Sequence, residues 1–141
     1  MAATECYEQI VSRLGELHKH LKRVQSQMLE AYHISLMEYH ILIIMMRMQR
    51  VSQNDLAAAL DVDKALISRQ IQSMEQKGLL HGTPDPECRR KKVLSLSVQA
   101  QELIPQLQEV HRRSLERIFS DFPEQQLREF QFILEGLVRK L

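Results

Sequence analysis

The chain has few of the residues on which several protein classes depend. Its 141 residues include two cysteines, four glycines, four prolines and no tryptophan. Cys6 and Cys88 belong to no CxxC pair and have no histidine at zinc-ligand spacing, so the sequence predicts neither a disulfide framework nor a metal site. No apolar run approaches the roughly 18 residues of a membrane span, and the N-terminus lacks the pattern of a signal peptide. These absences predict a cytoplasmic protein without a membrane partner.

Catalytic arrangements are also missing from the sequence. No Ser/His/Asp or Cys/His set occurs at a recognisable spacing, and the few glycines form no loop that could cradle phosphate groups. No paired carboxylates stand in a predicted cleft. We therefore expect no enzymatic activity, no catalytic residues and no cofactor.

What the chain does have is a basic middle. The stretch 64–92 holds seven basic and three acidic residues, a net charge of +4, whereas the remainder carries −3. One face that meets phosphate groups would produce this distribution. The length fits one domain, or a small module carried on a helical platform.

Long amphipathic helices are predicted at both ends of the chain. Apolar residues recur at steps of three and four from Tyr7 to Met28, again from Leu103 to Phe122, and from Leu127 to Leu141 after Pro123. These seams offer more apolar surface than the small middle can cover. Burial against a second copy, in a homodimer, is the expected solution.

The middle of the chain has helix-turn-helix spacing. Capping boxes begin helices at Ser35 and Ser52, and Asp63 can cap a further helix that ends before Gly78. Leu79–Thr83 and Val93–Ser97 are strand candidates on either side of a proline-containing connection, which predicts a two-stranded antiparallel wing.

These motifs, in this order, resemble the MarR family of winged helix-turn-helix transcriptional regulators. The residues that carry the resemblance are Met74-Glu-Gln-Lys-Gly-Leu-Leu80, Asp85-Pro-Glu-Cys-Arg-Arg90 and Val93-Leu-Ser-Leu-Ser97. Cys88 replaces an aspartate that orients a wing arginine in the family, and Ala100 replaces a glycine. The resemblance implies a mainly α fold with a small β wing, a winged helix-turn-helix on a helical dimerisation platform. The expected divisions are a dimerisation helix over 1–31, a DNA-binding module over 32–98 and dimerisation helices over 99–141, with the helix-turn-helix at about 52–77 and the wing at about 79–97.

The expected partner is double-stranded DNA. In a helix-turn-helix the start of the second helix enters the major groove, where arginine can bind guanine and glutamine can bind adenine. Wing residues contact the minor groove or the backbone. The expected DNA-binding residues are Lys64, Ala65, Ser68, Arg69, Gln70, Arg89, Arg90, Lys91 and Lys92. We expect a near-palindromic operator, bound by a repressor whose affinity responds to a ligand or to oxidation.

Further candidates concern regulation. Four methionines in or beside the second helix suggest either an ordinary core or a pliable pocket for a small aromatic acid, with His18, Lys22, Tyr39 and His40 as pocket candidates. Cys88, beside a cationic cluster, and Cys6 are candidate redox switches, although exposed cysteines without a role are common. The alternative function is a winged-helix protein that acts through protein contacts and not through DNA.

Overall fold

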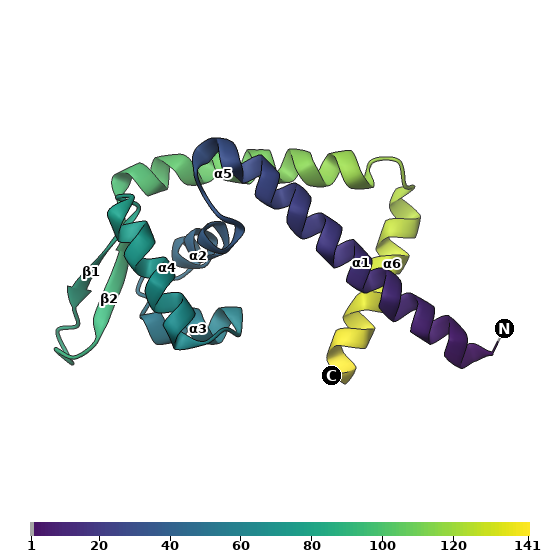
Figure 1. Ribbon diagram of the computed structural model, residues 1–141, viewed down its shortest axis with the longest axis horizontal. Helices are drawn as coiled ribbons and strands as arrows, with labels where there is room; N and C mark the ends of the chain where they lie inside the picture. Colours follow the sequence, from purple (N-terminus) through teal and green to yellow (C-terminus); the bar gives the residue numbers. More distant parts are fainter. Residues whose placement is uncertain (1) are drawn as a thin grey trace.

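The computed structural model describes residues 2–141, which form six α-helices, one 3-10 turn and a two-stranded antiparallel sheet (Figure 1). The elements are α1 (Ala3–Leu29), η1 (Glu30–Tyr32), α2 (Leu36–Arg47), α3 (Gln53–Leu60), α4 (Lys64–Gln76), β1 (Leu80–Pro84), β2 (Lys92–Leu96), α5 (Val98–Phe119) and α6 (Glu124–Lys140). The predicted fold class, mainly α with a small β wing, is confirmed.

The capping motifs form as the sequence predicts. Ser35 Oγ accepts from the Glu38 N–H at 3.1 Å, and the Glu38 carboxylate accepts from the Ser35 N–H at 2.9 Å. Ser52 and Asp55 repeat this arrangement at the start of α3 with the same two distances, 3.1 and 2.9 Å. Asp63 caps α4 by accepting from the Leu66 N–H at 2.8 Å. Each serine or aspartate thereby satisfies a backbone donor that the first helical turn leaves free.

The strands are displaced by one residue from the predicted bounds. Leu80 pairs with Leu96 and Pro84 with Lys92, whereas Leu79 and Ser97 lie outside the ladder. Leu79 closes the end of α4 by donating its N–H to Met74 O at 3.0 Å, after Gly78 has turned the chain with φ of +72°. Ser97 caps α5. The predicted strand ends therefore belong to the two helix caps.

The bounds of α5 also differ from those of the apolar repeat in the sequence, which runs from Leu103 to Phe122. The helix begins at Val98, before the first predicted apolar position, and continues through Pro105. It ends at Phe119, so Phe122 lies in the turn before α6.

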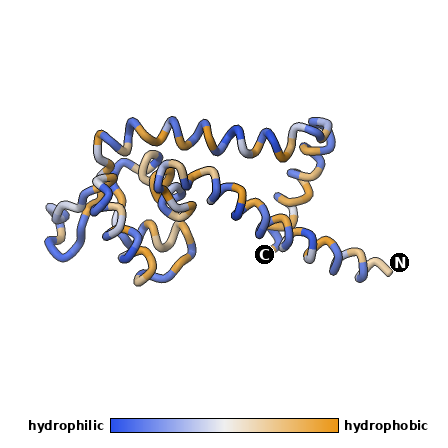
Figure 2. Tube along the Cα trace, turned by 45° about the horizontal axis from the view of Figure 1, so that its top comes forward, coloured by the Kyte–Doolittle hydropathy of each residue, from blue (hydrophilic) through white to orange (hydrophobic). Residues whose placement is uncertain are grey.

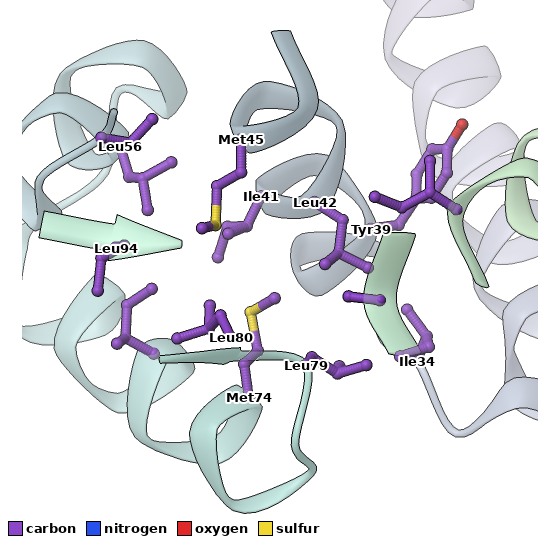
Figure 3. Close-up of a cluster of buried hydrophobic side chains, with 14 of the residues drawn as sticks. Ile34, Tyr39, Ile41, Leu42, Met45, Leu56, Met74, Leu79, Leu80 and Leu94 are labelled. Carbon is purple, nitrogen blue, oxygen red and sulfur yellow. The ribbon is translucent and has the colours of Figure 1, made fainter. Parts of the chain in front are cut away.

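The core is built around α2, which packs against α1, α3, α4, α5 and β2. Figure 3 shows Leu56, Met74, Leu80 and Leu94 around the side of α2 that carries Ile41 and Met45. Leu42 and Tyr39 point to the other side of α2, towards Ile34 (Figure 3). α2 is apolar on nearly all sides because other elements pack against nearly all of its sides.

The remaining helices extend away from this module. α1 and α6 cross at the end of the molecule remote from the wing, and α5 connects the two regions (Figure 1). Apolar and polar residues alternate along all three (Figure 2). α1 buries only Leu29 and α6 buries no residue, so apolar side chains stay exposed on both, among them Tyr7, Ile10, Phe130, Ile133 and Leu137. Within residues 2–141 no helix is both long and apolar enough to span a bilayer.

Candidate nucleic-acid interface

The first part of the candidate interface is the exposed face of α4. Ile67, Ile71 and Met74 bury one side of this helix in the core. At 100° per residue, Ala65 and Arg69 lie opposite that buried side, and both are exposed. Gln72 shares this face and is also exposed, but it is not among the residues predicted from the sequence. Arg69 therefore stands on the part of α4 that a DNA groove could reach.

The other predicted residues of α4 flank this face. Lys64 is exposed at the first position of the helix, and Ser68 is half-buried beside it. Gln70 is half-buried because it lies closer to the core side than Arg69 does. The helix thus presents Arg69 more openly than the neighbouring Gln70.

The second part of the interface is the tip of the wing. Asp85 organises this tip: its side chain accepts from the Glu87 N–H at 2.9 Å, and its backbone carbonyl accepts from the Cys88 N–H at 3.2 Å. The Asp85 N–H donates to Lys91 O at 2.8 Å, which closes the loop. These hydrogen bonds organise the tip around Asp85, and Cys88 takes part through its backbone. The basic residues of the tip are all exposed: Arg89, Arg90, Lys91 and Lys92.

A polar pocket of about 330 Å³ joins the wing to the start of α3. Arg90, Lys91 and Lys92 form one side of it, and Ser52, Gln53 and Asn54 form the other. The two sides are held together by the β-bridge between Val51 and Leu94, in which the Leu94 N–H donates to Val51 O at 2.8 Å. Sequence reasoning missed the three α3 residues as site residues. The capping box marked Ser52 as a helix start, but the strand-like pairing of Val51 gave no local signal.

The charges around this pocket favour an anion. Hydrogen bonds from the Ser52 backbone and side chain hold the pKa of Asp55 below its usual range, and the positive charge of Lys91 lowers it further. Asp55 is therefore ionised at neutral pH. Its carboxylate is occupied within the helix cap, where it accepts from the Ser52 N–H. The three cations, with the amide side chains of Gln53 and Asn54, can bind phosphate oxygens.

The predicted effector residues lie apart from the pocket that contains methionines. That pocket, of about 370 Å³, lies between α2, β2 and α5 and is lined by Met45, Met46, Gln49, Leu94, Ser95, Leu96 and Gln101. His18 and Lys22 are exposed on α1, and Tyr39 is buried in the core with 6% of its surface exposed. An aromatic acid effector stays a prediction from the resemblance.

Tyr39 and His40 belong instead to a group of side chains where α1, α2 and α5 meet. The ring of His111 lies 5.2 Å from that of Tyr39, and its Nε2 lies 2.9 Å from Gln25 Nε2. Burial lowers the pKa of His111 below its usual range. Burial, and then the nearby charge of His111, lower the pKa of His40, whereas burial raises that of Tyr39. Neutral imidazoles are favoured at this junction.

Both cysteines are exposed and free. Cys6 lines a pocket of about 600 Å³ along α1 that also includes Phe130 of α6, and Cys88 lies in the wing tip. In the described part of the chain, no three histidine, cysteine or acidic side chains gather as metal ligands would.

Comparison with known proteins agrees with this architecture. Residues 33–91 match the sequence model of the MarR family. Among solved structures, a MarR transcriptional regulator from Methanosarcina mazei Go1 is 24% identical, with a TM-score of 0.83 over 94% of this chain and 96% of that one. The transcriptional regulator BldR from Sulfolobus solfataricus is 18% identical, with a TM-score of 0.85 over 100% of both chains.

A structure that contains DNA is also similar. A cysteine-to-serine mutant of MarR from E. coli, in complex with operator DNA, is 12% identical, with a TM-score of 0.85 over 97% of this chain and 99% of that one. No curated protein sequence matches the chain. The chain therefore matches the MarR family in sequence over residues 33–91, which include α2, α3, α4 and β1, and has the fold of MarR transcriptional regulators over nearly its whole length.

Proposed function

We propose that this chain is a transcriptional regulator that binds a specific, near-palindromic DNA site as a homodimer. The observation that carries the proposal is the pairing of two polar surfaces within one module. The exposed Arg69 face of α4 can enter a major groove, and the polar pocket between the wing and α3 can hold the phosphate backbone.

The two arginines have different roles in this proposal. Arg69 stands where base edges would lie, and a bidentate arginine–guanine contact discriminates between bases by roughly 1–3 kcal/mol. Arg90 lines the polar pocket beside Lys91 and Lys92, so it contributes to DNA contacts that depend less on sequence. The role we propose for the dimer is repression, because a protein bound to DNA blocks the access of other proteins to that site.

The exposed apolar faces of α1 and α6 support the homodimer. Two copies related by a twofold axis would place their α4 helices about one DNA turn apart, roughly 34 Å, and would select a near-palindrome.

The test is a selection of bound duplexes from a random DNA pool, run with the wild type, Arg69→Ala and Arg90→Ala. Arg117→Ala, which removes an exposed arginine of α5, is the matched control. We expect the wild type and the control to enrich one near-palindrome. Arg69→Ala should relax base preference, whereas Arg90→Ala should weaken binding to all sequences and reduce its salt dependence. Absence of enrichment by the wild type would overturn the proposal and favour a role through protein contacts.

A further inference from the structure

One buried carboxylate lies outside the DNA-facing surfaces. Glu38, in the first turn of α2, has only 2% of its surface exposed. Its carboxylate accepts from the Ser35 N–H at 2.9 Å, from Ser73 Oγ at 3.3 Å and from Lys77 Nζ, which lies 2.9 Å from each carboxylate oxygen. The helix cap alone would use one of these contacts. Through Ser73 and Lys77, Glu38 also binds α4, in addition to capping α2.

The partners of Glu38 belong to the end of the DNA-facing helix. Ser73 is in the last turns of α4, and Lys77 is its C-cap residue. The same Lys77 Nζ also donates to the backbone carbonyl of His33 at 2.7 Å. His33 follows η1 and adopts a left-handed conformation, with φ of +56°. Since η1 continues directly from α1, the ammonium group of Lys77 joins the end of α4 to the connector between α1 and α2.

These hydrogen bonds restrict the rotation of α4 more than its apolar packing alone would. Ile67, Ile71 and Met74 hold the helix against the core, but apolar contacts are not directional and tolerate small rotations. Hydrogen bonds between charged groups require a defined geometry, and a buried carboxylate strongly disfavours any position of α4 that leaves it without its partner.

We propose that Lys77 and Glu38 are positioning residues for DNA recognition, which fix the orientation of α4 relative to the connector that follows α1. This inference rests on the proposed function, because the orientation matters when two α4 helices must enter successive grooves. Neither residue contacts DNA. They set the separation of the helices, and thereby the half-site spacing that the homodimer accepts.

The test compares DNA sites that differ only in the distance between their half-sites. The variant is Glu38→Gln/Lys77→Met, which removes both charges together, so that no buried carboxylate is left without its cation. It keeps an amide oxygen to accept from the Ser35 N–H. Lys77→Arg, which retains the charge, serves as the rescue. Lys19→Met, which removes an exposed lysine of α1, is the matched control.

We expect the wild type, Lys77→Arg and Lys19→Met to prefer the selected spacing over sites one base pair longer or shorter. The double variant should lose this preference by about tenfold, the size of a typical coupling between sites, and bind an isolated half-site as the wild type does. A loss of stability alone would weaken binding to all these sites alike. An unchanged spacing preference in the double variant overturns the inference.

A second readout needs no DNA. Amide hydrogen exchange should become faster in residues 30–35 and 73–79 of the double variant and stay unchanged in the core of α2. Unchanged exchange at 30–35 also overturns the inference. Should the wild type select no DNA at all, the proposed function fails by itself, and the exchange result alone decides whether Lys77 holds the connector.

Discussion

Ser35 and Ser52 each begin a helix and stabilise it, and one of them also belongs to the candidate site. Ser35 and Ser52 head capping boxes of the same geometry, but only Ser52 lines the polar pocket. Ser52→Ala and Ser35→Ala should each lower the free energy of unfolding by about 1 kcal/mol, measured by urea denaturation. Only Ser52→Ala should in addition weaken DNA binding several-fold, because the start of α3 frays beside the bound backbone. Equal DNA affinities for the two variants would remove α3 from the interface.

Gly78 is the residue on which the turn from α4 into the wing depends. Its φ of +72° is disfavoured for any residue with a Cβ, although a Cβ there would meet only Gln99 Oε1, at 3.4 Å. Gly78→Ala should therefore destabilise the fold by about 1–2 kcal/mol through backbone strain and not through a clash. Gly15→Ala, in the exposed middle of α1 with nothing within 4 Å, should instead stabilise by about 0.5–1 kcal/mol. Thermal unfolding of both variants at one protein concentration checks the two opposite signs.

At the scale of elements, the junction of α1, α2 and α5 should respond to pH. Burial lowers the pKa of His111 and His40 below the ordinary value of 6.5, so the folded state resists protonation. The unfolded chain takes up protons as the pH falls through about 6.5, and the stabilisation present above that pH is lost as the folded-state pKa values are passed.

Denaturation at a series of pH values tests this sign. The free energy of unfolding of the wild type should fall from about pH 7.5 to about pH 5.5. His111→Gln, which can still accept from Gln25, should show a shallower fall. His18→Gln, at an exposed position of α1, is the comparison variant for the loss of one histidine elsewhere. Parallel slopes for wild type and His111→Gln would exclude His111 as the source.

Local sequence signals predicted the elements well and their long-range contacts poorly. The Ser35 and Ser52 boxes, Asp63 and Gly78 act within a few residues, and each forms as expected. Contacts between distant segments carry no such signal, so the bridge from Val51 to Leu94 and the bonds of Lys77 to Glu38 could not be predicted. Of the candidate site, the sequence indicated the exposed face of α4 and the wing cations, but not the α3 side of the pocket between them.

At the scale of the whole molecule, the main feature is that apolar faces of α1 and α6 are left uncovered. Phe130 and Leu137 of α6 remain 40% and 42% exposed, and Phe130 borders the pockets along α1 and beside the end of α5. In a homodimer these faces would be buried, and an unpaired carboxylate there would be costly. Because a single winged helix contacts only half of a palindrome, separation of the copies should affect DNA binding as well.

Phe130→Glu and Leu137→Glu should therefore shift the protein from dimer to monomer in analytical ultracentrifugation. Affinity for the full palindrome should fall by at least about tenfold, towards that of an isolated half-site, whereas half-site binding itself should change little. Gln125→Glu adds the same charge to an exposed polar position of α6 and should leave the dimer intact. A wild type that sediments as a monomer, or variants that remain dimeric, would show that these apolar faces serve another purpose, because neither result fits burial of α6 between two copies.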